Sequence, residues 1–138
     1  MEIREAIRRT SDALYAGWNA HDADAVAACY APDAEVIDAT SGIITHGRAS
    51  IRAVAEGRLA GFAEYELTRE TLLIDGMQGA ESWCMRGTHT GDYDGLAPTG
   101  RHVAVKGSTL STYDAAGFIV RDTHYVNVLG LLRQLGVE

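Results

Sequence analysis

Four β-type runs fill the second half of the chain, and they restrict its fold more than any other feature. Alternating and β-branched residues define runs over Tyr65–Ile74, Ala80–Thr90, His102–Tyr113 and Phe118–Val128. The segments that connect them read DGMQG, GDYDGLAPTG and DAAG, and glycine turns and loops of this kind suit antiparallel neighbours. The sequence therefore predicts an antiparallel meander from about residue 64 onward.

The first 60 residues predict helices with one short hairpin among them. Apolar residues recur at spacings of three, four and seven, and the expected helices cover Met1–Asn19, Asp22–Tyr30 and Gly47–Leu59. Between the second and third helices, the run AEVID predicts a strand that turns at Gly42 and returns to His46. A short helical pattern after Gly130 ends the chain and could fold back as a lid or plug.

Helices followed by a meander predict an α+β fold. We expect a single domain over residues 1–138, in which a curved antiparallel sheet forms a cone and about three N-terminal helices cover its mouth. A chain of this length buries enough surface to fold without a metal or a disulfide. A cone of this kind can hold a small apolar ligand.

Composition and charge argue against several classes of partner. The formal net charge is −7 and the arginines are scattered, which argues against nucleic acid. Cys29 and Cys84 lie in apolar segments without CxxC spacing, so we expect buried thiols. The N-terminus does not resemble a signal peptide, and no run approaches the roughly 20 apolar residues of a membrane span. We expect a cytoplasmic protein without a membrane partner.

The last predicted strand carries an acid and an imidazole on the same face. Asp122 and His124 are two residues apart, so their side chains point to one side of the strand. His124 is either a structural histidine with satisfied hydrogen bonds or a proton-transfer group in a cavity. Asp122 either orients that imidazole or emerges at the solvated end of the strand, and we favour the solvated position.

Two other charged residues allow a structural and a functional interpretation. Asp38 follows two apolar residues and precedes a turn, so it either forms an Asx turn or is a partly desolvated carboxylate at the mouth of the cone. Lys106 interrupts an apolar strand and is either an edge charge or a partner for an anionic intermediate. We favour the edge charge for Lys106.

Large side chains could shape the cavity or pack as ordinary core. This group contains Tyr15, Trp18, Trp83, Met85 and Tyr125. Thr109 is a candidate for a polar wall of the pocket. His46, His89 and His102 lack the spacing of a preformed ligand set, so no metal site is expected.

Four segments, in order, resemble a known family. AGWNAHDADAVAACYAPDAEVID, HGRASIRA, RGTHTGDYDGLAPTGR and LGLLRQLG are similar to the SnoaL-like polyketide cyclases of the nuclear transport factor 2-like superfamily, which are related to the ketosteroid isomerases. The resemblance covers nearly the whole chain. It implies a cystatin-like α+β barrel with a deep pocket, no cofactor, a homodimer, and a polyketide-like or polycyclic carbonyl substrate.

The resemblance also implies roles for individual residues. His124 occupies the position of the cyclases' acid/base aspartate, and Asn127 stands where many other relatives carry an aspartate. Asp38 matches the catalytic base of the isomerases, whose phenolic donor would fall on Leu14. His89 recurs in the family's GTHTG-like segment and could be a donor at the pocket mouth.

These observations predict a cofactor-independent cyclase or isomerase that acts by general acid/base proton transfer on a small, largely apolar carbonyl compound. We expect His124 and Asp38 to be catalytic, and the substrate-binding set to be Tyr15, Trp18, Trp83, Met85, His89, Thr109 and Asn127. The alternatives are a non-catalytic small-molecule-binding or scaffold protein of the same fold and an epoxide-opening or hydroxylating relative.

Overall fold

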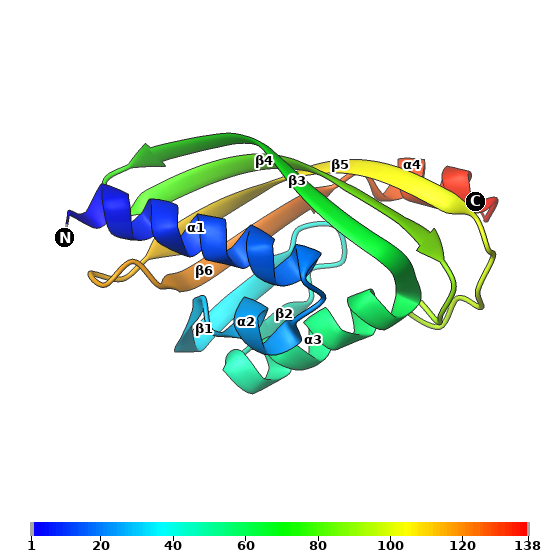
Figure 1. Ribbon diagram of the computed structural model, residues 1–138, viewed down its shortest axis with the longest axis horizontal. Coiled ribbons are helices and arrows are strands. Elements are labelled where there is room, and N and C mark those ends of the chain that lie inside the picture. Colours follow the sequence, from blue (N-terminus) through cyan, green and yellow to red (C-terminus); the bar gives the residue numbers. More distant parts are fainter. Residues whose placement is uncertain (1, 138) are drawn as a thin grey trace.

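A computed structural model describes residues 2–137 and shows four helices and a six-stranded sheet (Figure 1). The elements in chain order are α1 (Ile3–Asn19), α2 (Ala23–Ala27), β1 (Tyr30–Asp38), β2 (Ile44–His46), α3 (Arg48–Gly61), β3 (Phe62–Asp75), β4 (Gln78–His89), β5 (His102–Tyr113), β6 (Ile119–Val126) and α4 (Val128–Leu135). The strand order is β2-β1-β6-β5-β4-β3, so the sheet has two free edges and does not close.

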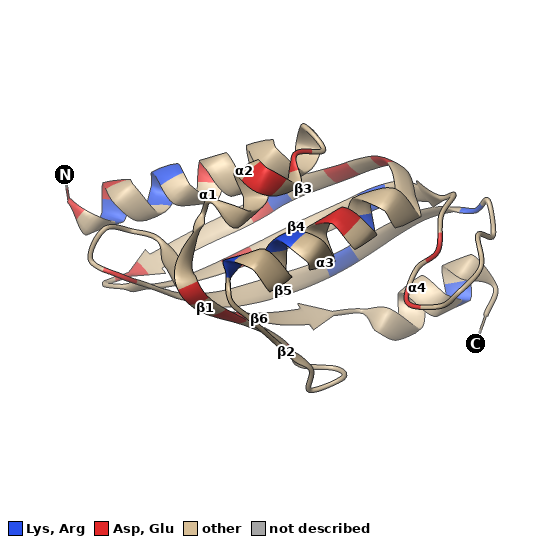
Figure 2. Cartoon of the chain, turned by 90° about the horizontal axis from the view of Figure 1, so that it is seen from below, with Lys and Arg blue, Asp and Glu red and all other residues tan. Residues whose placement is uncertain are grey.

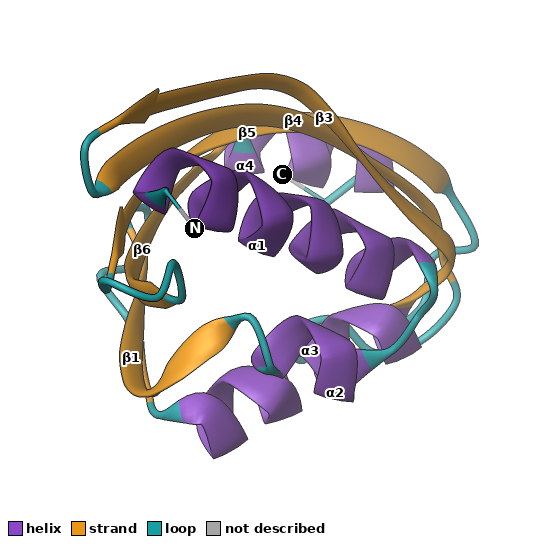
Figure 3. Ribbon diagram, turned by 60° about the vertical axis from the view of Figure 1, so that its left-hand side comes forward, coloured by secondary structure: helices purple, strands orange, loops and turns teal. Residues whose placement is uncertain are grey.

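The sheet is strongly curved, and α1 lies across its concave side, with α2 packed against α1 and α3 packed against α2 (Figure 3). Side chains from the inner face of the sheet pack against these helices and form the core, which includes Ile7, Phe62, Val103 and Ile119. The predicted α+β fold with N-terminal helices over a curved sheet is therefore confirmed.

The sheet is mixed, whereas the sequence predicted an antiparallel one. β1 runs parallel to β6, with Asp38 as the register partner of His124, and the other four pairings are antiparallel. The turn chemistry fixes the direction of strands joined by short connections, but β1 and β6 are separated by most of the chain, so no local signal sets their relative direction.

The second helix is shorter than the sequence predicted. Asp22 caps α2 by accepting a hydrogen bond from the Ala25 N–H at 3.1 Å, but the helix ends at Ala27. Tyr30 instead begins β1, where it pairs with Ile119. Pairing with a buried strand therefore overrides the helical pattern in this segment.

Lys106 is not an edge charge, because β5 is an interior strand between β4 and β6. Its ammonium group lies on the exposed side of the sheet, 3.3 Å from the Glu70 carboxylate.

Both cysteines are free and buried, as predicted. Acidic and basic residues are spread over helices and strands (Figure 2). Within residues 2–137, no helix is both long and apolar enough to cross a membrane.

The helix α4 closes one end of the sheet. The Gln134 side chain accepts from the Ala104 N–H at 2.7 Å and donates to the Ala104 carbonyl at 2.9 Å, which ties α4 to β5. Leu131 and Leu135 are buried. The helix therefore packs as part of the fold.

Ile7 tests how α1 is held on the sheet. It is completely buried, so Ile7→Ala should lower the free energy of unfolding by about 2–5 kcal/mol in urea titrations. Ile44→Ala is the matched control, because Ile44 is 56% exposed and its truncation should cost less than about 1 kcal/mol. Equal losses in the two variants would contradict the packing described here.

Candidate active site

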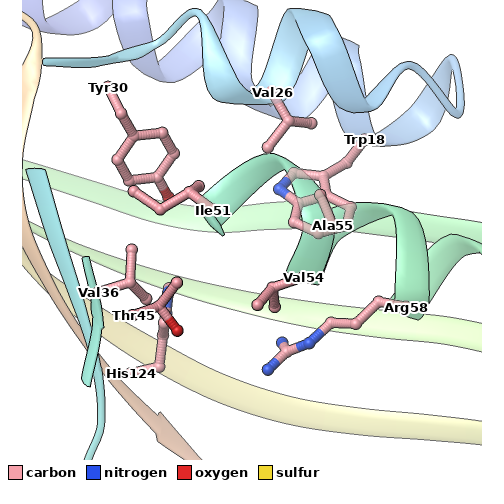
Figure 4. Close-up of a pocket in the computed structure, with 10 residues that line it drawn as sticks. All are labelled: Trp18, Val26, Tyr30, Val36, Thr45, Ile51, Val54, Ala55, Arg58 and His124. Carbon is pink, nitrogen blue, oxygen red and sulfur yellow. The ribbon is translucent and has the colours of Figure 1, made fainter. Parts of the chain in front are cut away.

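Three adjoining hollows lie between the helices and the inner face of the sheet. The first hollow is shown in Figure 4. It shares four lining residues with the second hollow, namely Trp18, Tyr30, Arg58 and His124. Arg58, Tyr65 and Trp83 line both the second and the third. Because neighbouring hollows share walls, we treat them as one branched cavity, and Arg58 is the residue common to all its parts. Their volumes are only about 40, 60 and 50 Å³, which suits a small ligand.

His124 projects from β6 into this cavity and is held by a chain of hydrogen bonds. Its Nδ1 lies 2.9 Å from the Thr109 hydroxyl, and that hydroxyl accepts a hydrogen bond from the Trp83 indole N–H, also at 2.9 Å. The indole can only donate, whereas the hydroxyl has one proton and two lone pairs, so Thr109 can accept from the indole and still donate to Nδ1. If Thr109 donates to Nδ1, the proton of neutral His124 is on Nε2. In the other tautomer, Nδ1–H would donate to the second lone pair of the hydroxyl.

Asp122 is the nearest acid to this imidazole and is buried, with 1% of its surface exposed. Its carboxylate accepts hydrogen bonds from the Tyr30 hydroxyl at 2.7 Å and the Ser111 hydroxyl at 2.5 Å. The sequence interpretation that favoured a solvated position is wrong, because Asp122 faces the interior, where it lines the second hollow together with Tyr15 and Tyr30. The His124 Nε2 lies 3.9 Å from Asp122 Oδ2, a distance for an ion pair and too long for a hydrogen bond.

The surroundings of His124 lower its pKa. Burial is the largest cause, because removing water disfavours the imidazolium, and the positive charge of Arg58 acts in the same direction. The carboxylates of Asp122 and Asp38 oppose this shift. Since a free histidine has a pKa of about 6.5, the lowered value keeps His124 neutral at pH 7.

Asp38 forms the Asx turn that the sequence offered as one interpretation, and it also borders the cavity. Its Oδ1 accepts hydrogen bonds from the backbone N–H groups of Thr40 at 2.8 Å and Ser41 at 3.3 Å, which is an Asx turn. The residue also lines the third hollow. Within the described part of the chain, its Oδ2 has no hydrogen-bond partner. Because Asp38 and His124 are register partners in neighbouring parallel strands, their side chains lie on the same face of the sheet.

Five of the seven residues predicted to bind substrate line the cavity, namely Tyr15, Trp18, Trp83, Met85 and Thr109. Trp18 stacks on Tyr65 with ring centroids 5.2 Å apart. Burial and nearby charges raise the pKa of Tyr15, with burial the larger cause, so its phenol stays protonated.

His89 and Asn127 lie away from the cavity. His89 is fully buried against the Phe62 and Tyr93 rings, and its Nδ1 accepts a hydrogen bond from the Thr99 N–H at 3.1 Å. It therefore fastens the loop between β4 and β5. Asn127 caps α4 by accepting from the Gly130 N–H at 2.9 Å. Both side chains have structural partners in the fold.

Sequence reasoning missed two charged residues of the cavity. Arg58 lies seven residues after Ile51 and three after Ala55, which places it on the buried face of α3. Glu81 is in phase with Trp83 and Met85 on β4 and is buried, with its carboxyl group bonded by Ser11. Burial raises the pKa of Glu81. In both cases, the sequence signal that could have identified the residue was a charged side chain on an otherwise apolar face of its helix or strand.

Comparison with known proteins identifies the family. The family model of the SnoaL-like polyketide cyclases matches residues 8–135, which is nearly the whole chain. The chain belongs to the SnoaL-like polyketide cyclase family. This confirms the resemblance seen in the sequence and supports a cyclase or isomerase type of role in general. No curated protein matches the sequence.

Solved structures show the same fold. IdmH from Streptomyces antibioticus, for which polyketide cyclase activity has been proposed, is 27% identical, with 94% of this chain and 98% of that chain covered and a TM-score of 0.77. TsrD from Streptomyces laurentii is 20% identical, with 98% of each chain covered and a TM-score of 0.88. AclR from Streptomyces galilaeus, a proposed hydroxylase, is 21% identical, with 98% and 87% covered and a TM-score of 0.83.

The described residues contain no group of three or more His, Cys, Asp or Glu side chains placed to hold a metal ion. The polar groups that face the cavity are instead an imidazole, carboxyl groups, hydroxyls and one guanidinium. These groups can exchange protons and stabilise charge.

The pKa of His124 tests its surroundings directly. We expect its NMR titration midpoint to fall below about 6.5, since burial disfavours the imidazolium. Asp122→Asn should lower the midpoint further, because the Asp122 carboxylate raises the pKa of His124 more than the Asp38 carboxylate does. The resonance is assigned by its loss in His124→Gln. A midpoint that rises in Asp122→Asn would contradict this electrostatic account.

Proposed function

We propose that the protein catalyses the cyclisation or isomerisation of a small carbonyl compound by cofactor-independent proton transfer at the carbon next to the carbonyl. The observation that carries this proposal is the pairing of Asp38 with His124 at matched positions of β1 and β6, on the cavity side of the sheet. Family membership supports the same class of reaction. The small volume of the cavity favours a compact substrate over a large polycyclic one.

The geometry favours distinct roles for the two groups. Asp38 has a carboxylate oxygen without a hydrogen bond, so it is the base that removes the proton from the α-carbon. We assign to neutral His124 the tautomer in which Nδ1 accepts from Thr109 and Nε2 carries the proton, so that Nε2–H donates a hydrogen bond to the carbonyl oxygen. The electron pair of the broken C–H bond forms the enolate, whose oxygen His124 stabilises.

The second half of the reaction decides the product class. In isomerisation, Asp38 returns its proton to a different carbon of the enolate. In an aldol cyclisation, the enolate carbon attacks a second carbonyl carbon, and the new alkoxide takes the proton that Asp38 holds. Both routes begin with the same proton abstraction and need no oxidant or reductant.

We also propose that the protein is a homodimer whose copies meet at the outer face of the sheet. Thr109 and His124 face the cavity, so the neighbouring Leu110 and Tyr125 face outward, and about half of each side chain is exposed. Exposed apolar groups on a sheet face are typical of an interface between subunits.

Deuterium exchange tests the proposed chemistry. The probe is 3-cyclohexen-1-one in D2O, in which NMR follows deuterium entry at the α-carbon and absorbance follows conversion to the conjugated ketone. Asp38→Asn and His124→Gln should each lower the enzymatic rate by roughly 100-fold or more, the usual contribution of general acid/base groups. His46→Gln and Asp75→Asn are matched controls, because both residues are exposed and away from the cavity.

If Asp38→Asn and His124→Gln both kept the wild-type rate, the roles assigned to Asp38 and His124 would be refuted. Rates no faster than buffer across a panel of enolisable ketones would favour the non-catalytic binding protein, the alternative that shares this fold.

A further inference from the structure

Arg58 is a cation in the cavity that no carboxylate of the described residues neutralises. Its side chain points from α3 into the pocket (Figure 4) and lines all three hollows. A guanidinium is always protonated and offers five N–H donors. Within residues 2–137, none of these donors makes a hydrogen bond to the protein, and no carboxylate lies within 4 Å of the group.

The other arginine of α3 with a similar exposure behaves differently. Arg52 lies on the outer side of the helix and forms ion pairs with Asp24 and with Glu56. Arg58 is half-buried among Trp18, Tyr65 and the aliphatic wall of the first hollow. A charge in apolar surroundings is costly unless a partner neutralises it. Within residues 2–137, no carboxylate contacts Arg58, so its charge remains available to a ligand.

None of the acids that line the cavity forms an ion pair with Arg58, which leaves its positive charge available to a ligand. Asp122 accepts two hydrogen bonds, from Tyr30 and Ser111. Glu81 is bonded by Ser11, and its raised pKa favours its neutral form. One oxygen of Asp38 is bound by the backbone of its turn. The cavity thus presents an unsatisfied cation beside the Nε2–H donor of His124.

We propose that Arg58 selects substrates that carry an anionic oxygen, such as a carboxylate, in addition to the reacting carbonyl, on a compact apolar frame. This inference deepens the proposed function, on which it rests for the reaction, by naming the substrate class. A planar guanidinium binds a carboxylate with two parallel hydrogen bonds, which fixes the orientation of the ligand as well as its charge. Arg58 then sets which end of the substrate faces Asp38 and His124.

Matched ligands test this selection without any turnover. Benzoate and benzamide have nearly the same shape and differ in charge, and their binding is followed by NMR chemical shifts of the cavity residues. Wild type should bind benzoate more tightly than benzamide. Arg58→Met should weaken benzoate binding by roughly tenfold or more, the usual effect of losing a charge-assisted contact, and leave benzamide binding unchanged. Arg58→Lys should restore part of the benzoate affinity.

Arg52→Met is the control, because it removes an arginine from the same helix but outside the cavity, and it should change neither affinity. A second readout needs no ligand: Arg58→Met should raise the NMR-titrated pKa of His124, since Arg58 lowers it while Asp122 and Asp38 raise it.

The inference is overturned if wild type does not prefer benzoate to benzamide, or if Arg58→Met weakens the binding of both ligands equally. It fails independently of the proposed function. If wild type prefers benzoate but the Asp38 and His124 variants exchange deuterium as fast as wild type, only the proposed chemistry is refuted. If these variants lose exchange as expected but wild type does not prefer benzoate, only the role of Arg58 is refuted.

Discussion

The hydrogen-bond chain from Trp83 through Thr109 to His124 is the interaction on which the proposed chemistry depends. It joins β4, β5 and β6 across the inner face of the sheet. Because an indole can only donate, Thr109 accepts from Trp83, and its own proton is available for donation to Nδ1. In that arrangement the imidazole is held at one nitrogen and presents the other as a donor. A rigid sheet, rather than a mobile loop, positions this group.

The parallel pairing of β1 with β6 supplies the second constraint. It brings Asp38, from the first strand, beside His124, from the last, although most of the chain separates them. The helix α3 follows β1 and β2 in sequence and carries Arg58 over the same cavity. A carboxylate, an imidazole and a guanidinium thus converge from three distant segments. In a chain with net charge −7, this arrangement places a positive group inside the fold.

Local patterns in the sequence predicted most elements, because the periods of two and 3.6 residues and the glycine turns are local signals. The relative direction of β1 and β6 has no local signal, and the sequence could not supply it. Asp122 was misjudged because the sequence shows which face of a strand a residue occupies but not what covers that face. Arg58 could have been found, since it shares the helical face of Ile51 and Ala55. The roles of His124 and Asp38 remain predictions.

The tautomer of His124 is the most direct test of this account. Long-range ¹H–¹⁵N NMR correlations distinguish a protonated Nε2 from a protonated Nδ1 in a neutral imidazole. The account predicts that, at a pH where His124 is neutral, Nε2 carries the proton and Nδ1 is the acceptor of the Thr109 hydroxyl. A proton on Nδ1 would reverse the chain, turn Nε2 into a base and contradict the assignment of His124 as the donor to the substrate oxygen.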